Sequence, residues 1–263
     1  HMHSSFSADS DTPMEVMIHR AVETGLQGIT FTEHLDPDYP VTPDNLDFSL
    51  DISSYQKKLI EMQSLYKDKI HLRFGIELGL QMHLGDYFNS LLSQTPFDFV
   101  IGSSHLVHGY DPYYPDFFEG RKEFLCYMEY FESILENISV YDDFDVYGHI
   151  DYVVRYGPNK NREYSYGRYK DILDEILKKL ISMGKGIELN TGGYHYGLGE
   201  PNPCTAVIRR YRELGGEIIT IGADAHTPDK IACAFDKAAS VLEACGFRYY
   251  TIFKDRKPEF ISL

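Results

Sequence analysis

The segment Gly28-Ile29-Thr30-Phe31-Thr32-Glu33-His34 contains the pattern that decides the fold. Its apolar and β-branched residues predict a strand, and a glutamate and a histidine follow directly at the C-terminal end of that strand. A helix is predicted before it over residues 13–22, because Thr12 is a suitable N-cap, Pro13 suits the first helical position and Gly25 follows the last turn. A helix therefore leads into a strand that ends in two side chains able to bind a metal.

The same unit recurs along the chain, and most of the later strands also end in a histidine or a carboxylate. Further helices are predicted over 54–66, 87–93, 121–137, 169–183, 205–214 and 228–244, and further strands over 70–76, 97–102, 144–148, 186–190, 217–222 and 249–253. Strands that alternate with helices of this length indicate a parallel sheet with helical crossovers. No dinucleotide fingerprint or P-loop is present to favour a nucleotide-binding open sheet.

The position of the polar side chains separates a barrel from an open sheet. An open doubly wound sheet binds its ligand at one switch point, whereas a β/α barrel builds its site from the C-terminal ends of many strands. We therefore predict an α/β fold, a distorted TIM-like barrel forming one domain over 1–263, with its metal site at those strand ends. A barrel needs a strand before its first helix, so we expect that strand to be truncated or missing before His1. His1 itself is either native or a remnant of a tag.

Composition limits the classes of function. The chain has 263 residues, 43% of them hydrophobic, which is enough for one large core. A net charge of −15 argues against a nucleic-acid backbone as a partner, although ordinary solubilising charge explains it equally well. We find no apolar run of about 18 residues, no signal peptide and no C-x-x-C pair. We expect a cytoplasmic enzyme that acts on a small molecule, without nucleic acid or membrane; the oligomeric state is not predicted.

Candidate metal ligands lie at the predicted strand ends and in the opening motif. They are His1, His3, Asp9, His34, Glu77, His105, His149, Asp224 and His226. One histidine beside a strand is usually structural, but its repetition at successive strand ends favours ligands. Nine ligands suit two or three metals, and a metal cluster can activate water and hold phosphoryl oxygens for attack. Because cysteine is missing from these positions, Zn, Mn and Fe all remain possible.

These motifs resemble those of the polymerase and histidinol phosphatase (PHP) superfamily, and most closely its histidinol-phosphatase branch. The resemblance rests on the segments 1–9, 32–34, 75–77, 102–105, 148–157, 188–192 and 222–226, with branch-specific likeness in 197–201, 210–216 and 256–258. It implies a distorted seven-stranded β/α barrel with three metal ions.

The resemblance also divides the ligands among the metals. It implies that His1, His3, Glu77 and Asp224 bind one metal, that Asp9, His34 and His226 bind a second, and that Glu77, His105 and His149 bind a third. It implies a phosphomonoesterase that converts L-histidinol phosphate to L-histidinol and phosphate, a step of histidine biosynthesis, by a hydroxide that bridges two metals. Another phosphate ester, such as a nucleotide or a phosphoprotein, is the alternative substrate. A non-catalytic module is disfavoured because the ligand set looks complete.

Other residues are candidates for contact with the substrate. Arg155 follows His149 by six residues and suits a phosphate contact, although an exposed position at the barrel rim is the alternative. His195 and, more weakly, Arg162 are further phosphate candidates. Proton transfer to the leaving group is expected from Asp9, His34 or His226, and the residues do not decide which of the three. Glu33 and Asp151 are expected to orient imidazoles or meet a substrate amine, and Glu188 to be structural.

Overall fold

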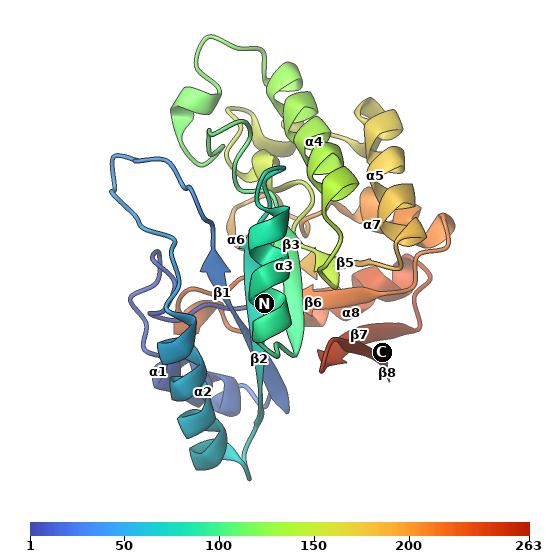
Figure 1. Cartoon of the computed structure of the whole chain (residues 1–263). Helices are drawn as coiled ribbons and strands as arrows, with labels where there is room; N and C mark the ends of the chain where they lie inside the picture. Colours follow the sequence, from blue (N-terminus) through green and yellow to red (C-terminus); the bar gives the residue numbers. More distant parts are fainter.

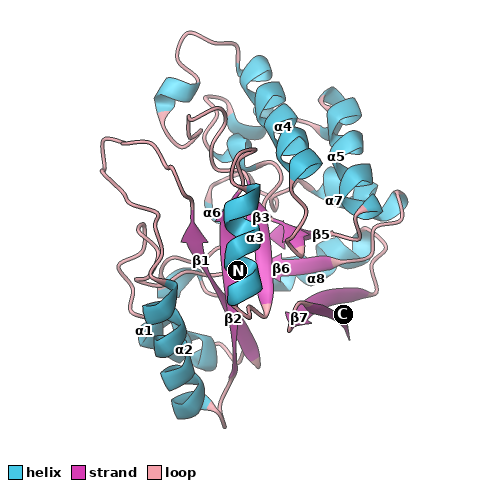
Figure 2. Ribbon diagram, in the orientation of Figure 1, coloured by secondary structure: helices cyan, strands magenta, loops and turns pink.

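The computed structural model describes all residues 1–263 and contains a sheet of six parallel strands in the order β1-β2-β3-β4-β5-β6. The strands are β1 (Gly28–Leu35), β2 (His71–Gly79), β3 (Phe99–Ser103), β4 (Val146–Tyr147), β5 (Gly186–Asn190) and β6 (Ile219–Gly222). They curve into a half-barrel, and the helices lie on its outside (Figures 1 and 2). The predicted α/β alternation is therefore confirmed.

Most helices follow the predicted ranges. The helices are α1 (Met14–Glu23), α2 (Ile52–Tyr66), α3 (Gly85–Gln94), α4 (Glu123–Val140), α5 (Lys170–Ser182), α6 (Gly192–His195), α7 (Thr205–Glu213) and α8 (Phe235–Ala244). The last one begins at Phe235 instead of residue 228, because Ala232 and Ala234 at positive φ interrupt the segment, and a short helix over Gly192–His195 was not predicted. Short 3-10 turns occupy Pro115–Phe117, Tyr152–Arg155, Lys160–Arg162, Tyr166–Arg168 and Pro228–Lys230. α5 shows why these segments are helical, since Leu173, Ile176, Leu177 and Leu180 are buried at helical spacing. None of the helices combines the length and apolarity that crossing a membrane requires.

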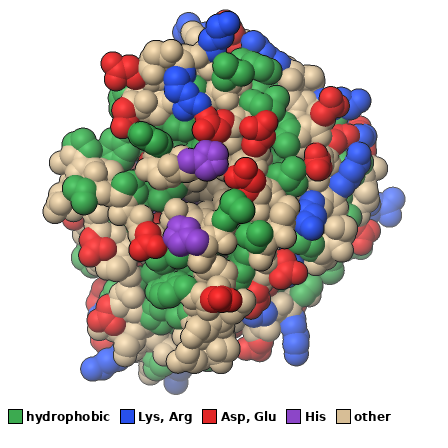
Figure 3. Space-filling view, turned by 45° about the horizontal axis from the view of Figure 1, so that its top comes forward, with side chains coloured by type: hydrophobic (Ala, Val, Ile, Leu, Met, Phe, Trp, Pro, Cys, Tyr) green, Lys and Arg blue, Asp and Glu red, His purple; other side chains and the backbone are tan.

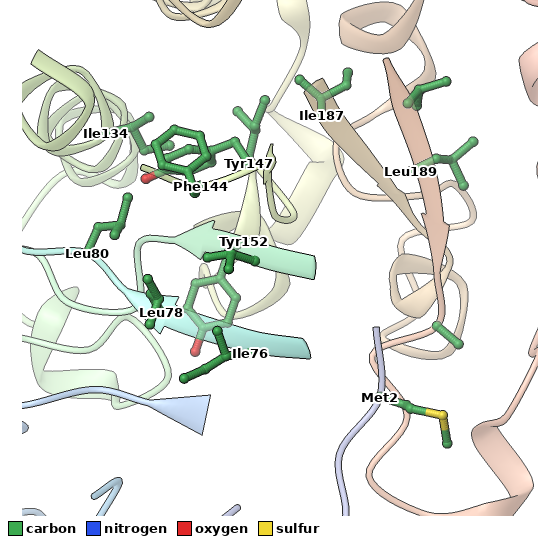
Figure 4. Close-up of a cluster of buried hydrophobic side chains, with 14 of the residues drawn as sticks. Met2, Ile76, Leu78, Leu80, Ile134, Phe144, Tyr147, Tyr152, Ile187 and Leu189 are labelled. Carbon is green, nitrogen blue, oxygen red and sulfur yellow. The ribbon is translucent and has the colours of Figure 1, made fainter. Parts of the chain in front are cut away.

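One core of 58 buried residues joins the sheet to the helices. Figure 4 shows part of it, where Leu78 of β2, Ile134 of α4 and Tyr147 of β4 are all fully buried. β3 and β5 are buried along their whole length, as expected for parallel strands covered on both faces. The scaffold that carries the strand ends is therefore rigid.

The C-terminal segment departs from the predicted pattern. The expected seventh strand, β7 (Tyr249–Lys254), does not join the parallel sheet but pairs antiparallel with β8 (Lys257–Ser262). Asp255 and Arg256 have φ of 49° and 61°, so the chain turns back in two residues. The Arg256 side chain also bonds to Asp145, just before β4. The parallel sheet therefore has six strands rather than seven.

The first three residues lie between the two edge strands of the sheet. The Thr32 N–H of β1 donates to the Met2 carbonyl at 2.9 Å. On the other side, the His3 N–H donates to the Ala225 carbonyl at 2.9 Å, and the Asp224 N–H donates to the His1 carbonyl at 3.1 Å. Met2 also forms a parallel bridge with Ala225. Backbone hydrogen bonds thus connect β1 to the end of β6 and place His1 and His3 beside the other strand ends.

An ion pair between α5 and α7 gives a prediction about stability. Arg210 donates to both carboxylate oxygens of Asp174, at 2.9 and 2.7 Å, and the Tyr166 hydroxyl donates to the same group at 2.7 Å. These hydrogen bonds, with that of Arg210 the largest, lower the pKa of Asp174 to about 2. We expect Asp174→Asn to lower the free energy of unfolding at pH 7 by about 1–3 kcal/mol.

The pH dependence of this effect has a definite sign. Because the folded-state pKa lies below the usual value of about 3.9, the stabilisation is complete above pH ~4 and disappears as pH falls through about 2. Urea unfolding of wild type and variant between pH 7 and pH 2 measures the difference. Glu175→Gln, at the next and exposed position of α5, is the control. An equal loss in both variants, or a difference that persists unchanged at pH 2, contradicts the prediction.

Candidate active site

Glu77 lies at the centre of the strand ends and is completely buried. The register of β1 and β2 places it directly beside His34. Its Oε1 accepts from the Ser103 hydroxyl at 2.6 Å and lies 3.0 Å from Nε2 of His149. Its Oε2 lies 3.1 Å from Nε2 of His1 and 3.2 Å from Nδ1 of His34. One carboxylate is therefore shared by imidazoles from opposite sides of the half-barrel.

His3 and His105 complete the ring of imidazoles around Glu77, with their Nε2 atoms 3.5 and 3.4 Å from its oxygens. Burial opposes a charge on Glu77, but His1, His34 and His105 hold its pKa well below the usual range. Glu77 is therefore an ionised carboxylate surrounded by five imidazole rings.

Four groups of donor atoms, each within 4.8 Å of one another, have the composition of a metal site. They are His1–His3–Glu77–Asp224, Glu77–His105–His149, His3–His34–His226 and His34–Asp36–His105. The first two groups contain the same residues that the family resemblance implied as ligands of two of the metals. The third contains His34 and His226 but not Asp9, and the fourth was not predicted.

Asp9 nevertheless lies beside the predicted pair of histidines. Its Oδ2 is 3.1 Å from Nε2 of His226 and 3.6 Å from Nε2 of His34. Burial raises the pKa of Asp9, but the two imidazoles outweigh it and hold that pKa well below the usual range. The structure thus brings all nine predicted ligands to one place.

The outward nitrogens of several imidazoles are held by polar partners. Nδ1 of His1 lies 2.6 Å from Glu188, and Nδ1 of His105 lies 2.7 Å from Asp36. Such partners fix the orientation and tautomer of a metal-binding imidazole. Glu188, predicted to be structural, thus contacts an imidazole of the site directly, and so does Asp36, which was missed. The alternation of a strand contained a signal for Asp36, because a residue two positions after His34 lies on the same face.

Glu33 and Asp151 do not contact an imidazole directly, and neither lines the cavity, so their predicted contact with a substrate amine finds no support. Glu33 accepts hydrogen bonds from residues of the 4–7 turn. Asp151 accepts from the Asn202 side chain at 2.6 Å and from the Cys204 N–H at 2.8 Å. Both carboxylates are buried, and these hydrogen bonds satisfy them within the protein.

Unpartnered buried atoms show that this donor set fits metal ions. Nε2 of His3 and Nδ1 of His34 are buried without a hydrogen-bond partner, although both face Glu77. Buried polar atoms normally have a partner, and a metal ion held beside Glu77 would provide one for each of these nitrogens. Burial, together with His34 and His226, holds the pKa of His3 well below its usual value. A neutral imidazole is the form that binds a metal, and rings mixed with carboxylates suit borderline divalent ions.

Arg155 is buried beside the imidazoles and is not an exposed rim residue. Its Nη1 donates to Asp224 at 2.9 Å, and its Nε donates to the Asn202 side-chain oxygen at 2.9 Å. Burial opposes the charge, but Asp224 raises the pKa of Arg155 above its ordinary value. The Tyr196 ring lies 4.7 Å from the guanidinium carbon. Nη2 has no partner, so a charged donor is left for an anion.

A cavity of about 340 Å³ opens above these side chains, and Figure 3 shows histidines beside a hollow on this face. Among the predicted residues, its walls include Asp9, His34, His105, His149, Arg155, His195, Asp224 and His226. His1, His3 and Glu77 lie deeper and are not part of the cavity wall. Arg162 is exposed in a 3-10 turn and does not line the cavity, so the structure gives its predicted phosphate contact no support.

Another carboxylate of the cavity wall, Asp111, was missed. It is buried and accepts hydrogen bonds from the hydroxyls of Tyr39 and Tyr152, at 2.6 and 3.2 Å, and from the Tyr113 N–H at 2.7 Å. Burial raises the pKa of Asp111. These residues come from loops, where no periodic pattern indicates proximity; the tyrosine-rich run 110–114 was the one available signal.

Known proteins resemble this chain over most of its length. The model of the PHP domain family matches residues 1–192. A histidinol-phosphatase of Lactococcus lactis is 31% identical, over 98% of this chain and 94% of the relative. A probable histidinol-phosphatase of Clostridium acetobutylicum is 32% identical, over 94% of this chain and 93% of the relative.

Solved structures show the same fold. The crystal structure of the Lactococcus lactis histidinol phosphate phosphatase, complexed with zinc, L-histidinol and phosphate, superposes with a TM-score of 0.91, covering 98% of this chain and 97% of that one at 31% identity. A putative histidinol phosphatase from Listeria monocytogenes, 18% identical, shares the fold with a TM-score of 0.78 over 90% of this chain and 98% of that one. By these matches, the chain belongs to the PHP domain family.

Proposed function

We propose that this protein is a metal-dependent phosphomonoesterase that hydrolyses L-histidinol phosphate to L-histidinol and phosphate, a step of histidine biosynthesis. The observation that carries the proposal is a buried carboxylate, Glu77, shared by five imidazoles next to a buried guanidinium with a free donor. The Lactococcus lactis relative, whose structure contains zinc, L-histidinol and phosphate, supports the same substrate.

The residues that would hold metal are those of the predicted division. His1, His3, Glu77 and Asp224 would bind one ion, Asp9, His34 and His226 a second, and Glu77, His105 and His149 a third. Such ions supply Lewis acidity and lower the pKa of a bound water. We propose three divalent ions, with zinc favoured over manganese and iron by the zinc in the related structure. Glu188 and Asp36 would keep the rings of His1 and His105 in place.

Arg155 would bind the phosphoryl group. Its contacts with Asp224 and Asn202 fix the guanidinium plane, and the unpartnered Nη2 would donate to a phosphoryl oxygen. A charge that develops on phosphorus during attack by water is then stabilised by a donor already in position. His195 lines the same cavity and would add a second contact.

The group of Asp9, His34 and His226 would serve the proton transfer. When the P–O bond to the substrate carbon breaks, the leaving alkoxide must take up a proton. Asp9 and His226 lie 3.1 Å apart in the cavity wall, so both border the space in which the leaving oxygen would lie. We propose that one of these three residues is the donor.

Asp111 would bind the ammonium group of the substrate. The three hydrogen bonds to Asp111 come from neutral groups, so this buried carboxylate has no basic side chain to balance its charge. Tyr152 and Tyr156 line the same part of the cavity and present aromatic faces that favour a cation. The cavity would therefore bind phosphate at Arg155 and the amine at Asp111.

The remaining features follow from the same proposal. We propose that residues 1–3, through their backbone hydrogen bonds to β1 and to the segment after β6, supply the seventh unit of the barrel, and that the chain acts as one domain. We also propose a cytoplasmic enzyme that binds no nucleic acid.

A steady-state comparison of substrates tests the proposed function. We expect kcat/KM for L-histidinol phosphate to exceed that for a mononucleotide, phosphotyrosine and phenyl phosphate by at least tenfold. An equal or higher value for a mononucleotide or phosphotyrosine would favour the alternative, a PHP phosphoesterase with another substrate. Zinc-loaded enzyme without activity on any of the four contradicts a phosphomonoesterase.

Asp111→Asn tests the proposed amine site, with phenyl phosphate as the control substrate. A buried charge-assisted hydrogen bond contributes about 1.5–3 kcal/mol, so we expect kcat/KM for histidinol phosphate to fall roughly 10- to 100-fold. Phenyl phosphate has no amine, so its kcat/KM is expected to change by less than about threefold. A parallel loss on both substrates shows that Asp111 supports the fold of the cavity instead.

A further inference from the structure

The Ser7 hydroxyl lies between Glu33 and His3 and has all its hydrogen bonds assigned. It donates to Oε2 of Glu33 at 2.6 Å, because the ionised carboxylate can only accept. It accepts from the His34 N–H at 3.0 Å. Nδ1 of His3 lies 3.1 Å away. A hydroxyl has one hydrogen and two lone pairs, so the bond with His3 must use the remaining lone pair.

This count fixes the tautomer of His3. Because Ser7 can only accept from it, Nδ1 of His3 must carry the ring hydrogen. Nε2 then presents its lone pair toward Glu77 and Asp224, which lie 3.5 and 3.4 Å away. That lone pair is what a metal ion requires of an imidazole.

Glu33 sets the direction of the whole chain of hydrogen bonds. It is completely buried, and its carboxylate also receives the Ser4 hydroxyl at 2.6 Å and the Ser4 N–H at 3.0 and 3.1 Å. Burial raises the pKa of Glu33 to about 7, but these donors act against that rise, favour the ionised form and hold the carboxylate against the 4–7 turn. We propose that Glu33, without touching any imidazole, is a positioning residue that fixes His3 in its metal-binding tautomer through Ser7.

Other imidazoles of the cluster have a carboxylate or a carbonyl oxygen directly on Nδ1. His1 and His105 have a carboxylate directly on Nδ1, and His226 has the Asp224 carbonyl there at 3.0 Å. His3 has a hydroxyl in that place, and a hydroxyl can reverse its direction. Only the carboxylate behind it prevents this reversal. The inference rests on the metal site proposed above.

Glu33→Gln is expected to reverse the chain. The amide oxygen of the glutamine is needed by the two Ser4 donors, so its NH₂ group faces Ser7. Ser7 then accepts from the amide and donates its own hydrogen to Nδ1 of His3. The ring hydrogen moves to Nε2, where it blocks the lone pair that faces Glu77. Removing Ser7 prevents this, because no hydroxyl is then left to donate.

The test compares the wild type, Glu33→Gln, Ser7→Ala and the double variant. Zinc affinity is measured by competition with a chelator, with zinc as the only metal, and the His3 tautomer is measured by nitrogen-15 NMR. Loss of a residue that orients a ligand costs on the order of 10- to 100-fold in metal affinity, and we expect this loss in Glu33→Gln together with a shift of His3 to the Nε2–H form. The double variant is expected to bind zinc as tightly as Ser7→Ala. Asp174→Asn, which removes a carboxylate far from the relay, controls for general destabilisation and should leave both readouts unchanged.

The outcomes separate the two proposals. If Glu33 only supports the turn, the losses in the two single variants add in the double variant and the tautomer stays unchanged, which overturns the relay. Wild-type zinc affinity in Glu33→Gln overturns it equally. Failure of the wild type to bind zinc at all contradicts the metal site itself.

Discussion

Replacement of Glu77 by glutamine is expected to lower kcat/KM for L-histidinol phosphate by about 10³-fold or more, which corresponds to about 4 kcal/mol of lost transition-state stabilisation. Glutamine has nearly the same shape, so the packing around this buried position is kept. The single negative charge shared by the imidazoles is lost, and the amide offers them only one acceptor. Two of the three proposed metal sites include Glu77, so both should be weakened together.

Zinc content and activity should therefore fall in the same variant. Metal analysis after dialysis, together with the steady-state rate, measures both, and the thermal midpoint of the zinc-free proteins controls for misfolding. Glu175→Gln, an exposed position on α5, is expected to match the wild type in every readout. A Glu77→Gln enzyme that keeps its zinc and at least a tenth of its activity contradicts a shared bridging role for Glu77.

The strand-end ligands could be predicted from the sequence because their positions depend on local periodicity. Each of His34, Glu77 and His149 follows a run of apolar residues, and parallel strands bring their C-terminal ends to one edge. The same rule extended by two residues would have found Asp36. The tautomer of His3 depends on Ser7, which belongs to a turn outside this periodicity.

Residues that come from loops could not be predicted in this way. Asp111 and Tyr39 are joined by a hydrogen bond between two loops, and neither loop repeats a pattern that fixes its path. The C-terminal hairpin was missed for a related reason. Its turn places Asp255 and Arg256 at positive φ without a glycine, so the usual sequence signal of a two-residue turn is absent. Residues 1–3 connect β1 to the end of β6 through backbone hydrogen bonds. Because nearly every residue has the same backbone donor and acceptor, no side-chain pattern predicts this connection.

Replacement of Arg155 by methionine is expected to lower kcat/KM by about 10²–10³-fold, the effect of removing one positioned donor from a developing negative charge. Arg155→Lys should recover only part of this. A lysine keeps the charge, but its single ammonium group cannot hold Asp224 and Asn202 and also present a third donor in the same plane.

Arg155 also neutralises Asp224, so its loss has a second possible consequence that the experiment must separate. If Arg155 binds phosphate, inhibition by inorganic phosphate weakens in parallel with kcat/KM while the zinc content is unchanged. If Arg155 only holds Asp224, zinc is lost and phosphate inhibition of the remaining metal-loaded enzyme is the same as in wild type. Arg162→Met is the matched control, because this arginine is exposed and outside the cavity wall. Equal losses in Arg155→Met and Arg162→Met would show that net charge, rather than a bound guanidinium, attracts the substrate.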